Sequence, residues 1–231
     1  MIPGQKEIVR RGYDKLSYVY RSDETPDDQG DYAEWISILS DRVPKDAPVL
    51  DLGCGCGLPG TKLLSTKFDV TGVDFSEVQI QRARKLVPAA RFIRSDISNV
   101  ELPLGHFAAV ASFYAIIHIP LSEHRELLTR IAGWLQPGGY LLAILGHEAW
   151  TGTDESYLGV EGGRMCWSHA DEATYVQWIS DSGIHVHWKR FIPEGESGHT
   201  LVFAQKPPVD KSVPLCVDKE IARRSFQCDE K

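Results

Sequence analysis

The most informative segment of the sequence is a glycine-rich turn that directly follows a short apolar run. The run ends near Asp51, and glycine occupies positions 53, 55 and 57. Glycine lets a backbone adopt conformations that a Cβ would forbid and lets it approach a bound ligand closely. A dinucleotide-binding turn of the G-x-G-x-x-G type would need a third glycine at position 58, where the chain has leucine. The segment therefore indicates a ligand site and disfavours a nicotinamide dinucleotide as the ligand.

Histidine is the second residue type with candidate chemistry, because a neutral imidazole accepts a proton near pH 7. His118 follows a predicted strand, at the place where ligands bind in open α/β sheets. It is a candidate base, and a loop histidine that packs and hydrogen-bonds a carbonyl is the alternative. His169 is a second candidate base, and capping of a helix that starts near Ala170 is the alternative for Ser168 and His169. His147 is a third candidate, whereas His124, His185 and His187 are expected at the surface or in strands.

Short β-rich runs alternate with longer amphipathic stretches, which is typical of a parallel sheet with helices on its faces. The pattern predicts strands over residues 47–52, 68–73, 91–94, 107–113, 139–146, 185–192 and 198–205. It predicts helices over residues 5–20, 31–42, 58–66, 76–87, 122–135 and 170–182. The link between the last two strands is too short for a helical crossover, so these strands should form an antiparallel hairpin. We therefore expect an α/β fold: a doubly wound, seven-stranded, mostly parallel sheet with one antiparallel strand and helices on both faces.

Composition excludes several classes of protein. The chain has 231 residues, of which 42% are hydrophobic and 25% charged, as expected for one soluble domain. Its net charge of −7 lacks the basic footprint of a nucleic-acid-binding protein. No apolar run reaches the roughly 18 residues that span a bilayer, and the N-terminus has no apolar run typical of a signal peptide. We therefore expect a cytoplasmic protein with no nucleic-acid or membrane partner, as a monomer or homodimer.

The five cysteines show no paired metal-ligand spacing, so the sequence predicts no metal site. Cys54 and Cys56 lie inside the glycine turn, where a metal or redox pair is one interpretation and small filler side chains are the other.

The glycine turn resembles motif I of the class I S-adenosylmethionine-dependent methyltransferases, in which an acidic residue precedes alternating glycines. Asp51, Gly53, Gly55 and Gly57 match that pattern. Further landmarks of the family follow in order at the predicted strand ends: Gly72-Val-Asp74-Phe75-Ser76, Ser95-Asp96-Ile97, Phe113-Tyr114, and Leu135-Gln-Pro137-Gly138-Gly139 before the fifth strand. The resemblance covers residues 47–146 and implies a Rossmann-like, seven-stranded fold and S-adenosyl-L-methionine as the cofactor.

The resemblance assigns a role to each landmark. Asp74 would accept hydrogen bonds from the two ribose hydroxyls of the cofactor, and capping of the next helix, which Ser76 can supply instead, is the alternative. Asp96 and the Ile97 backbone N–H would bind the adenine edge, and simple capping of the loop by Asp96 is the alternative. The other residues implied in cofactor binding are Gly53 and Phe113 through backbone carbonyls, Phe75 on the adenine face, Tyr114 after the fourth strand, and Tyr13 and Tyr20 over the methionine end, where core packing is the alternative for both tyrosines.

The resemblance also divides the chain. Residues 1–206 would form a single methyltransferase domain, with an N-terminal helical lid over 1–46, a cofactor-binding core over 47–146, and a substrate insertion and closing hairpin over 147–206. Residues 207–231 would be a polar tail. The glycine-rich insertion between the fifth strand and the next helix is expected to shape the substrate pocket.

We accordingly expect a methyltransferase that acts on a small, partly apolar or aromatic metabolite, at oxygen or sulfur, with His118 as the general base. The many aromatic residues of the lid segments and the lack of an added recognition domain favour such an acceptor. The alternative from another class is a methyltransferase-like protein that binds the cofactor and serves as a regulatory or interaction partner. A nicotinamide oxidoreductase is the third hypothesis.

Overall fold

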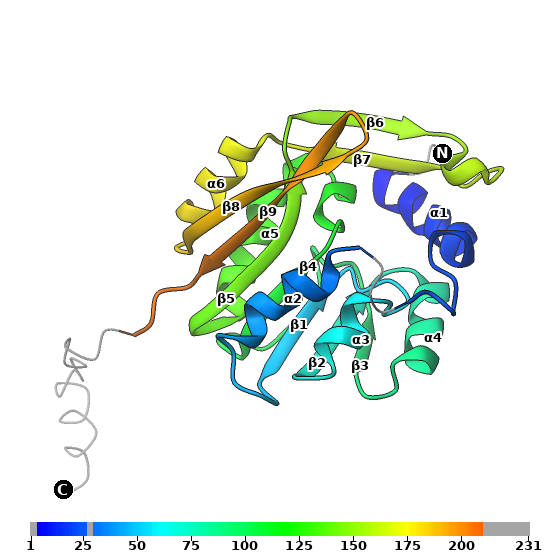
Figure 1. Cartoon of the computed structure of the whole chain (residues 1–231). Coiled ribbons are helices and arrows are strands. Elements are labelled where there is room, and N and C mark those ends of the chain that lie inside the picture. The colour runs from blue at the N-terminus through cyan, green and yellow to red at the C-terminus, as the bar shows by residue number, and fades with distance from the viewer. Residues whose placement is uncertain (1–3, 27–29, 210–231) are drawn as a thin grey trace, which may run out of the picture.

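Seven strands form one sheet in the order β3-β2-β1-β4-β5-β9-β8 in the computed structural model, which describes residues 4–26 and 30–209 (Figure 1). All neighbouring strands from β3 to β5 are parallel, and β9 is antiparallel to both of its neighbours. The strands are β1 (Pro48–Leu52), β2 (Asp69–Asp74), β3 (Arg91–Arg94), β4 (Phe107–Ser112), β5 (Leu135–Gly146), β8 (His185–Glu194) and β9 (Ser197–Gln205). The predicted fold class and its antiparallel hairpin are confirmed.

Helices cover both faces of this sheet because its central strands are apolar on both sides. In β1, Leu50 packs into one core and Val49 into the other, as the two-residue period of a strand requires. The first core holds apolar side chains of α5 (Leu121–Trp134) and α6 (Glu172–Asp181), and the second holds those of α2 (Tyr32–Ser40) and α3 (Gly60–Leu64). The parallel strand order reverses between β1 and β4, so a crevice opens at their carboxyl ends.

The helix α1 (Gln5–Tyr20) lies against α4 (Glu77–Leu86) at this carboxyl edge (Figure 1). Arg82 of α4 is only 4% exposed and donates hydrogen bonds to the backbone oxygens of Ser17 and Arg21 and to the Asp23 carboxylate. The Ser76 hydroxyl donates to Asp14 of α1 and accepts from the Gln79 backbone N–H, which caps α4. These contacts hold α1 over the strand ends, where the candidate site lies.

The glycine-rich insertion between β5 and α6 contains secondary structure that was not predicted. It contains a second sheet, in which β6 (Trp150–Asp154) pairs with β7 (Met165–His169) in antiparallel register. Ser168 and His169 therefore belong to β7 and do not cap α6, which begins at Glu172 with Asp171 as its cap. The expectation that they start a helix near Ala170 was wrong, because pairing with β6 extends the chain through His169.

Two other expectations need correction. His124 was expected at the surface or in a strand, but it lies on α5 and is fully buried, bonded to the Tyr175 hydroxyl through Nδ1 and to the Ile119 carbonyl through Nε2. The fifth strand begins at Leu135, four residues before the predicted start, and follows α5 without a loop. The predicted polar tail falls mostly outside the described residues. Within residues 4–26 and 30–209, no helix has the length and apolarity needed to cross a membrane.

Candidate functional site

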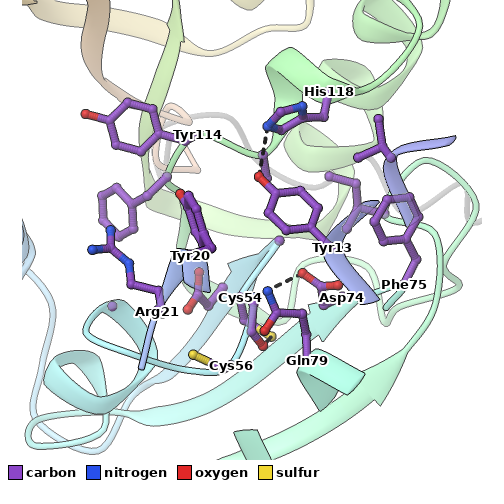
Figure 2. Close-up of a pocket in the computed structure, with 18 of the residues that line it drawn as sticks. Tyr13, Tyr20, Arg21, Cys54, Cys56, Asp74, Phe75, Gln79, Tyr114 and His118 are labelled. Atoms are coloured by element: carbon purple, nitrogen blue, oxygen red, sulfur yellow. Dashed lines mark hydrogen bonds between the residues drawn. The ribbon is translucent and has the colours of Figure 1, made fainter. Parts of the chain in front are cut away.

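Two adjoining cavities lie at the carboxyl edge of the sheet. The inner cavity, about 900 Å³, is bounded by the glycine turn, the ends of β2 and β4 and the helix α1. The outer cavity, about 970 Å³, is bounded by α1, the start of α2, β7 and the tip of the β8–β9 hairpin. Six residues line both cavities and form their boundary: Tyr13, Tyr20, Arg21, Tyr32, Tyr114 and His118. Figure 2 shows the inner cavity with this boundary.

The glycine turn lies close to neighbouring backbone. Gly53 has a φ of +75°, and a Cβ at this position would stand 2.0 Å from the Cβ of Ala115. A substituent there would collide with the segment after β4 and strain the backbone. The Gly55 backbone N–H donates to the Asp74 carboxylate at 3.0 Å, which ties the turn to the end of β2.

Asp74 is held at the end of β2 by backbone donors. One carboxylate oxygen accepts from Gly55 and the other from the Ser76 backbone N–H at 2.8 Å. Burial raises the pKa of Asp74 to about 6, although these backbone hydrogen bonds act in the opposite direction. The side chain lines the inner cavity and does not cap α4, since Ser76 does so. The ribose role is therefore compatible with the geometry.

Asp51 lies beneath the glycine turn and is 2% exposed. Its carboxylate accepts a hydrogen bond from the Thr61 hydroxyl at 2.6 Å. Burial raises its pKa to about 6, and the nearby Asp74 carboxylate adds to that rise. Two acidic side chains thus face one cavity with pKa values well above the usual range for aspartate.

The far end of the inner cavity combines apolar and polar groups. Phe75 and Ile97 line it together with Asp96. The Asp96 carboxylate accepts from Lys6 of α1 at 2.7 Å and from the Ser98 backbone N–H at 2.9 Å. Lys6 also pairs with Glu123 of α5, so α1 is bridged to two segments at this end.

His118 is the most constrained side chain at the boundary. Its Nδ1 lies 2.8 Å from the Cys166 carbonyl of β7, and its Nε2 lies 3.0 Å from the Tyr13 hydroxyl (Figure 2). A carbonyl only accepts, so Nδ1 carries the hydrogen and Nε2 offers its lone pair to Tyr13. Burial lowers the pKa of His118 to about 4. The imidazole is therefore neutral at physiological pH, with its accepting nitrogen facing the tyrosine.

Arg21 is a functional candidate that the sequence reading did not single out. Its guanidinium lines both cavities, contacts the rings of Tyr20 and Tyr32 at 5.2 and 5.6 Å, and donates to the Tyr32 hydroxyl. Among the described residues it forms no ion pair with a carboxylate. A cation in this position is suited to an anionic ligand group near the glycine turn, where Cys56 is one of its neighbours.

The outer cavity holds a second cluster that sequence reasoning missed. The Tyr114 hydroxyl interacts with the Glu194 carboxylate at the hairpin tip, and His199 Nδ1 lies 3.3 Å from the same carboxylate. Tyr114 itself has a φ of +62°, an unusual value for a tyrosine, which directs the residue after β4 toward this cavity.

Several predicted site residues lie elsewhere. Ser76 and Gly57 do not line the inner cavity, and a Cβ at Gly57 would approach Val87, the C-cap residue of α4, to 2.9 Å. His169 lines neither cavity, and among the described residues its Nδ1 has no hydrogen-bond partner. The other predicted residues do line the inner cavity: Tyr13, Tyr20, Asp51, Gly53, Gly55, Asp74, Phe75, Asp96, Ile97, Phe113, Tyr114 and His118. Within residues 4–26 and 30–209, no group of three or more histidine, cysteine or acidic side chains is arranged to hold a metal ion.

Comparison with known proteins identifies the core. Residues 49–139 match the family described as "Methyltransferase domain". The chain is 38% identical over 111 residues to an uncharacterized methyltransferase of Mycobacterium tuberculosis, a match that covers 47% of this chain and 55% of that protein. It is 39% identical over 106 residues to a trans-aconitate 2-methyltransferase of Paracidovorax citrulli, covering 43% of this chain and 40% of that protein. The chain thus matches about half the length of these curated relatives.

The whole arrangement resembles solved structures. The 1,6-didemethyltoxoflavin-N1-methyltransferase of Burkholderia thailandensis, solved with its substrate and S-adenosylhomocysteine, superposes with a TM-score of 0.68 at 16% identity over 90% of this chain and 92% of that one. The described residues therefore have the fold of the class I S-adenosylmethionine-dependent methyltransferases, and residues 49–139 match the methyltransferase domain family. S-adenosylmethionine is the cofactor that this domain implies.

Proposed function

We propose that this protein transfers a methyl group from S-adenosylmethionine to oxygen or sulfur of a small, partly apolar or aromatic metabolite. The observation that carries the proposal is the shared boundary of the two cavities. A cofactor in the inner cavity and an acceptor in the outer cavity would meet at Tyr13 and His118. Among the described boundary residues, this is the one pair in which a neutral imidazole faces a hydroxyl.

The inner cavity fits the cofactor group by group. Asp74 is a carboxylate at a strand end for the ribose hydroxyls, and Phe75 and Ile97 provide apolar surface for adenine beside Asp96. Arg21 supplies a cation near the glycine turn for the carboxylate of the methionine moiety. Bound there, the cofactor supplies an electrophilic methyl group on a sulfonium.

Tyr13 and His118 handle the proton of the acceptor. With the cofactor bound in the inner cavity as methyl donor, the Tyr13 oxygen would accept the proton that the acceptor oxygen or sulfur loses on methylation, and the Tyr13 proton would pass to His118 Nε2. A base with a pKa of about 4 is adequate, because the proton becomes strongly acidic as the new bond forms. The Cys166 carbonyl keeps Nδ1 protonated and thereby fixes the accepting nitrogen.

Calorimetry with S-adenosylhomocysteine tests the cofactor site. The Asp74→Ala variant should bind this product roughly tenfold or more weakly, the scale for removing a hydrogen-bonded charged partner, whereas Asp69→Ala, at the other end of β2, should bind it like the wild type. Unchanged binding by Asp74→Ala would refute the ribose role.

A screen of small acceptors with radiolabelled cofactor tests the reaction. Transfer that falls in His118→Ala, with S-adenosylhomocysteine affinity retained, supports the base assignment, and unchanged turnover rejects it. A protein that binds S-adenosylhomocysteine but methylates none of the acceptors would instead favour the regulatory alternative.

A further inference from the structure

The outer cavity contains a carboxylate for which the methyl-transfer chemistry has no use. Glu194, at the tip of the β8–β9 hairpin, lines this cavity with a side chain that is 42% exposed. Burial acts to raise the pKa of Glu194, but the polar contacts with His199 and Tyr114 outweigh that effect and lower it. The carboxylate is therefore charged at neutral pH and stands in a cavity with aromatic walls.

The negative charge of Glu194 is not matched by a permanent cation. Within residues 4–26 and 30–209, its one ionic partner is His199, which carries a charge only when protonated. Arg21 lines the same cavity, but among the described residues it forms no ion pair with Glu194.

The field of Glu194 extends through the outer cavity. Burial is the main cause that raises the pKa of four tyrosines lining this cavity, and the charge of Glu194 adds to the rise: Tyr20, Tyr32, Tyr114 and Tyr157. Trp35 and Trp167 also line this cavity. Aromatic side chains around a carboxylate are an environment that suits a cation, since ring quadrupoles and the carboxylate both attract positive charge. Because the proposed function assigns Arg21 to the cofactor carboxylate, the charged side chain that faces the acceptor is the negative Glu194.

We propose that the acceptor of this protein carries an ammonium group remote from the methylated atom and that Glu194 binds it, so the substrates are aromatic amines with a hydroxyl or thiol. The inference rests on the proposed function and deepens it. Glu194 is then a specificity-determining residue, and Tyr114 and His199 hold its carboxylate in place.

Three matched phenols test this preference. Tyramine, para-ethylphenol and phloretate share a para-substituted phenol on an ethyl stem and end in ammonium, hydrogen and carboxylate. Binding to the protein saturated with S-adenosylhomocysteine is followed by quenching of tryptophan fluorescence, because Trp35 and Trp167 line the cavity. Tyramine should bind about tenfold more tightly than phloretate, with para-ethylphenol between them, which is the combined scale of a partly exposed ion pair and a cation–π contact.

The isosteric Glu194→Gln variant should reduce the tyramine advantage to about twofold and leave para-ethylphenol unchanged. Glu196→Gln, an exposed change in the same hairpin turn, should retain the wild-type order. Phloretate binding equal to or tighter than tyramine, no binding of any probe, or equal weakening of all three in Glu194→Gln would overturn the proposal. Calorimetry with S-adenosylhomocysteine on the same samples tells the two hypotheses apart. If S-adenosylhomocysteine does not bind, the proposed function fails; if it binds but the phenols do not show the expected order, only the role of Glu194 fails.

Discussion

Protonation of His118 should destabilise the folded protein in a defined pH window. In the unfolded chain His118 binds a proton below about pH 6.5. In the folded protein burial lowers its pKa to about 4, so the imidazole stays neutral down to that pH. Between these values the unfolded state holds more protons, so the free energy of unfolding falls as the pH falls. The full effect is about 3 kcal/mol, and about 2 kcal/mol of it is expressed between pH 7.5 and pH 5.

Urea unfolding of the wild type and of His118→Asn at these two pH values measures the effect. The asparagine side chain of the variant does not titrate, so the wild type should lose about 2 kcal/mol more than the variant on going from pH 7.5 to pH 5. Other groups, such as Asp51 and Asp74 with raised pKa values, change both proteins alike and cancel in the difference. A difference between wild type and variant that does not change with pH would show that His118 is not buried in its neutral form, and the reasoning would fail.

Three further substitutions probe individual contacts. Tyr13→Phe, which removes the hydroxyl facing His118 Nε2, should lower kcat at least about tenfold with S-adenosylhomocysteine affinity within about twofold of wild type; an unchanged kcat would exclude the relay. Arg82→Ala removes one donor each from the backbone oxygens of Ser17 and Arg21 and should cost about 2–3 kcal/mol in chemical unfolding, against less than about 0.5 kcal/mol for the exposed Arg84→Ala. Equal effects would contradict the role of Arg82 in holding α1. His124→Ala should cost about 2–4 kcal/mol of the free energy of unfolding, because it removes the hydrogen bonds to the buried Tyr175 hydroxyl and Ile119 carbonyl and opens a cavity. His106→Ala is the exposed control, and a loss as small as that of the control would refute the buried network.

The sheet and the inner cavity could be predicted because their signals are local. Asp51 and Asp74 stand at the carboxyl ends of β1 and β2, and the pairing of these two strands brings both carboxylates to the same edge of the sheet. The hairpin followed from the short link between its strands. These features depend on neighbouring residues in the chain, so a single sequence contains them.

The remainder depends on contacts between distant residues. The burial of His124 is set by Tyr175, 51 residues away, and β6 and β7 pair with each other across a glycine-rich segment. In the sequence, Arg21 and Glu194 look like ordinary surface charges. Only the fold places them in the wall of a cavity. Their roles could not be read from spacing.

The position of α1 links the two ligands thermodynamically. Tyr13, Tyr20 and its C-cap residue Arg21 face both cavities, so a single helix forms a wall for cofactor and acceptor together. In the proposed function, any change that one ligand makes in the position of that helix would act on the binding of the other, and the coupling must be equal in both directions. A substitution in α1 that adapts the protein to a new acceptor therefore also changes its affinity for the cofactor, whereas changes at the hairpin tip are free of that constraint.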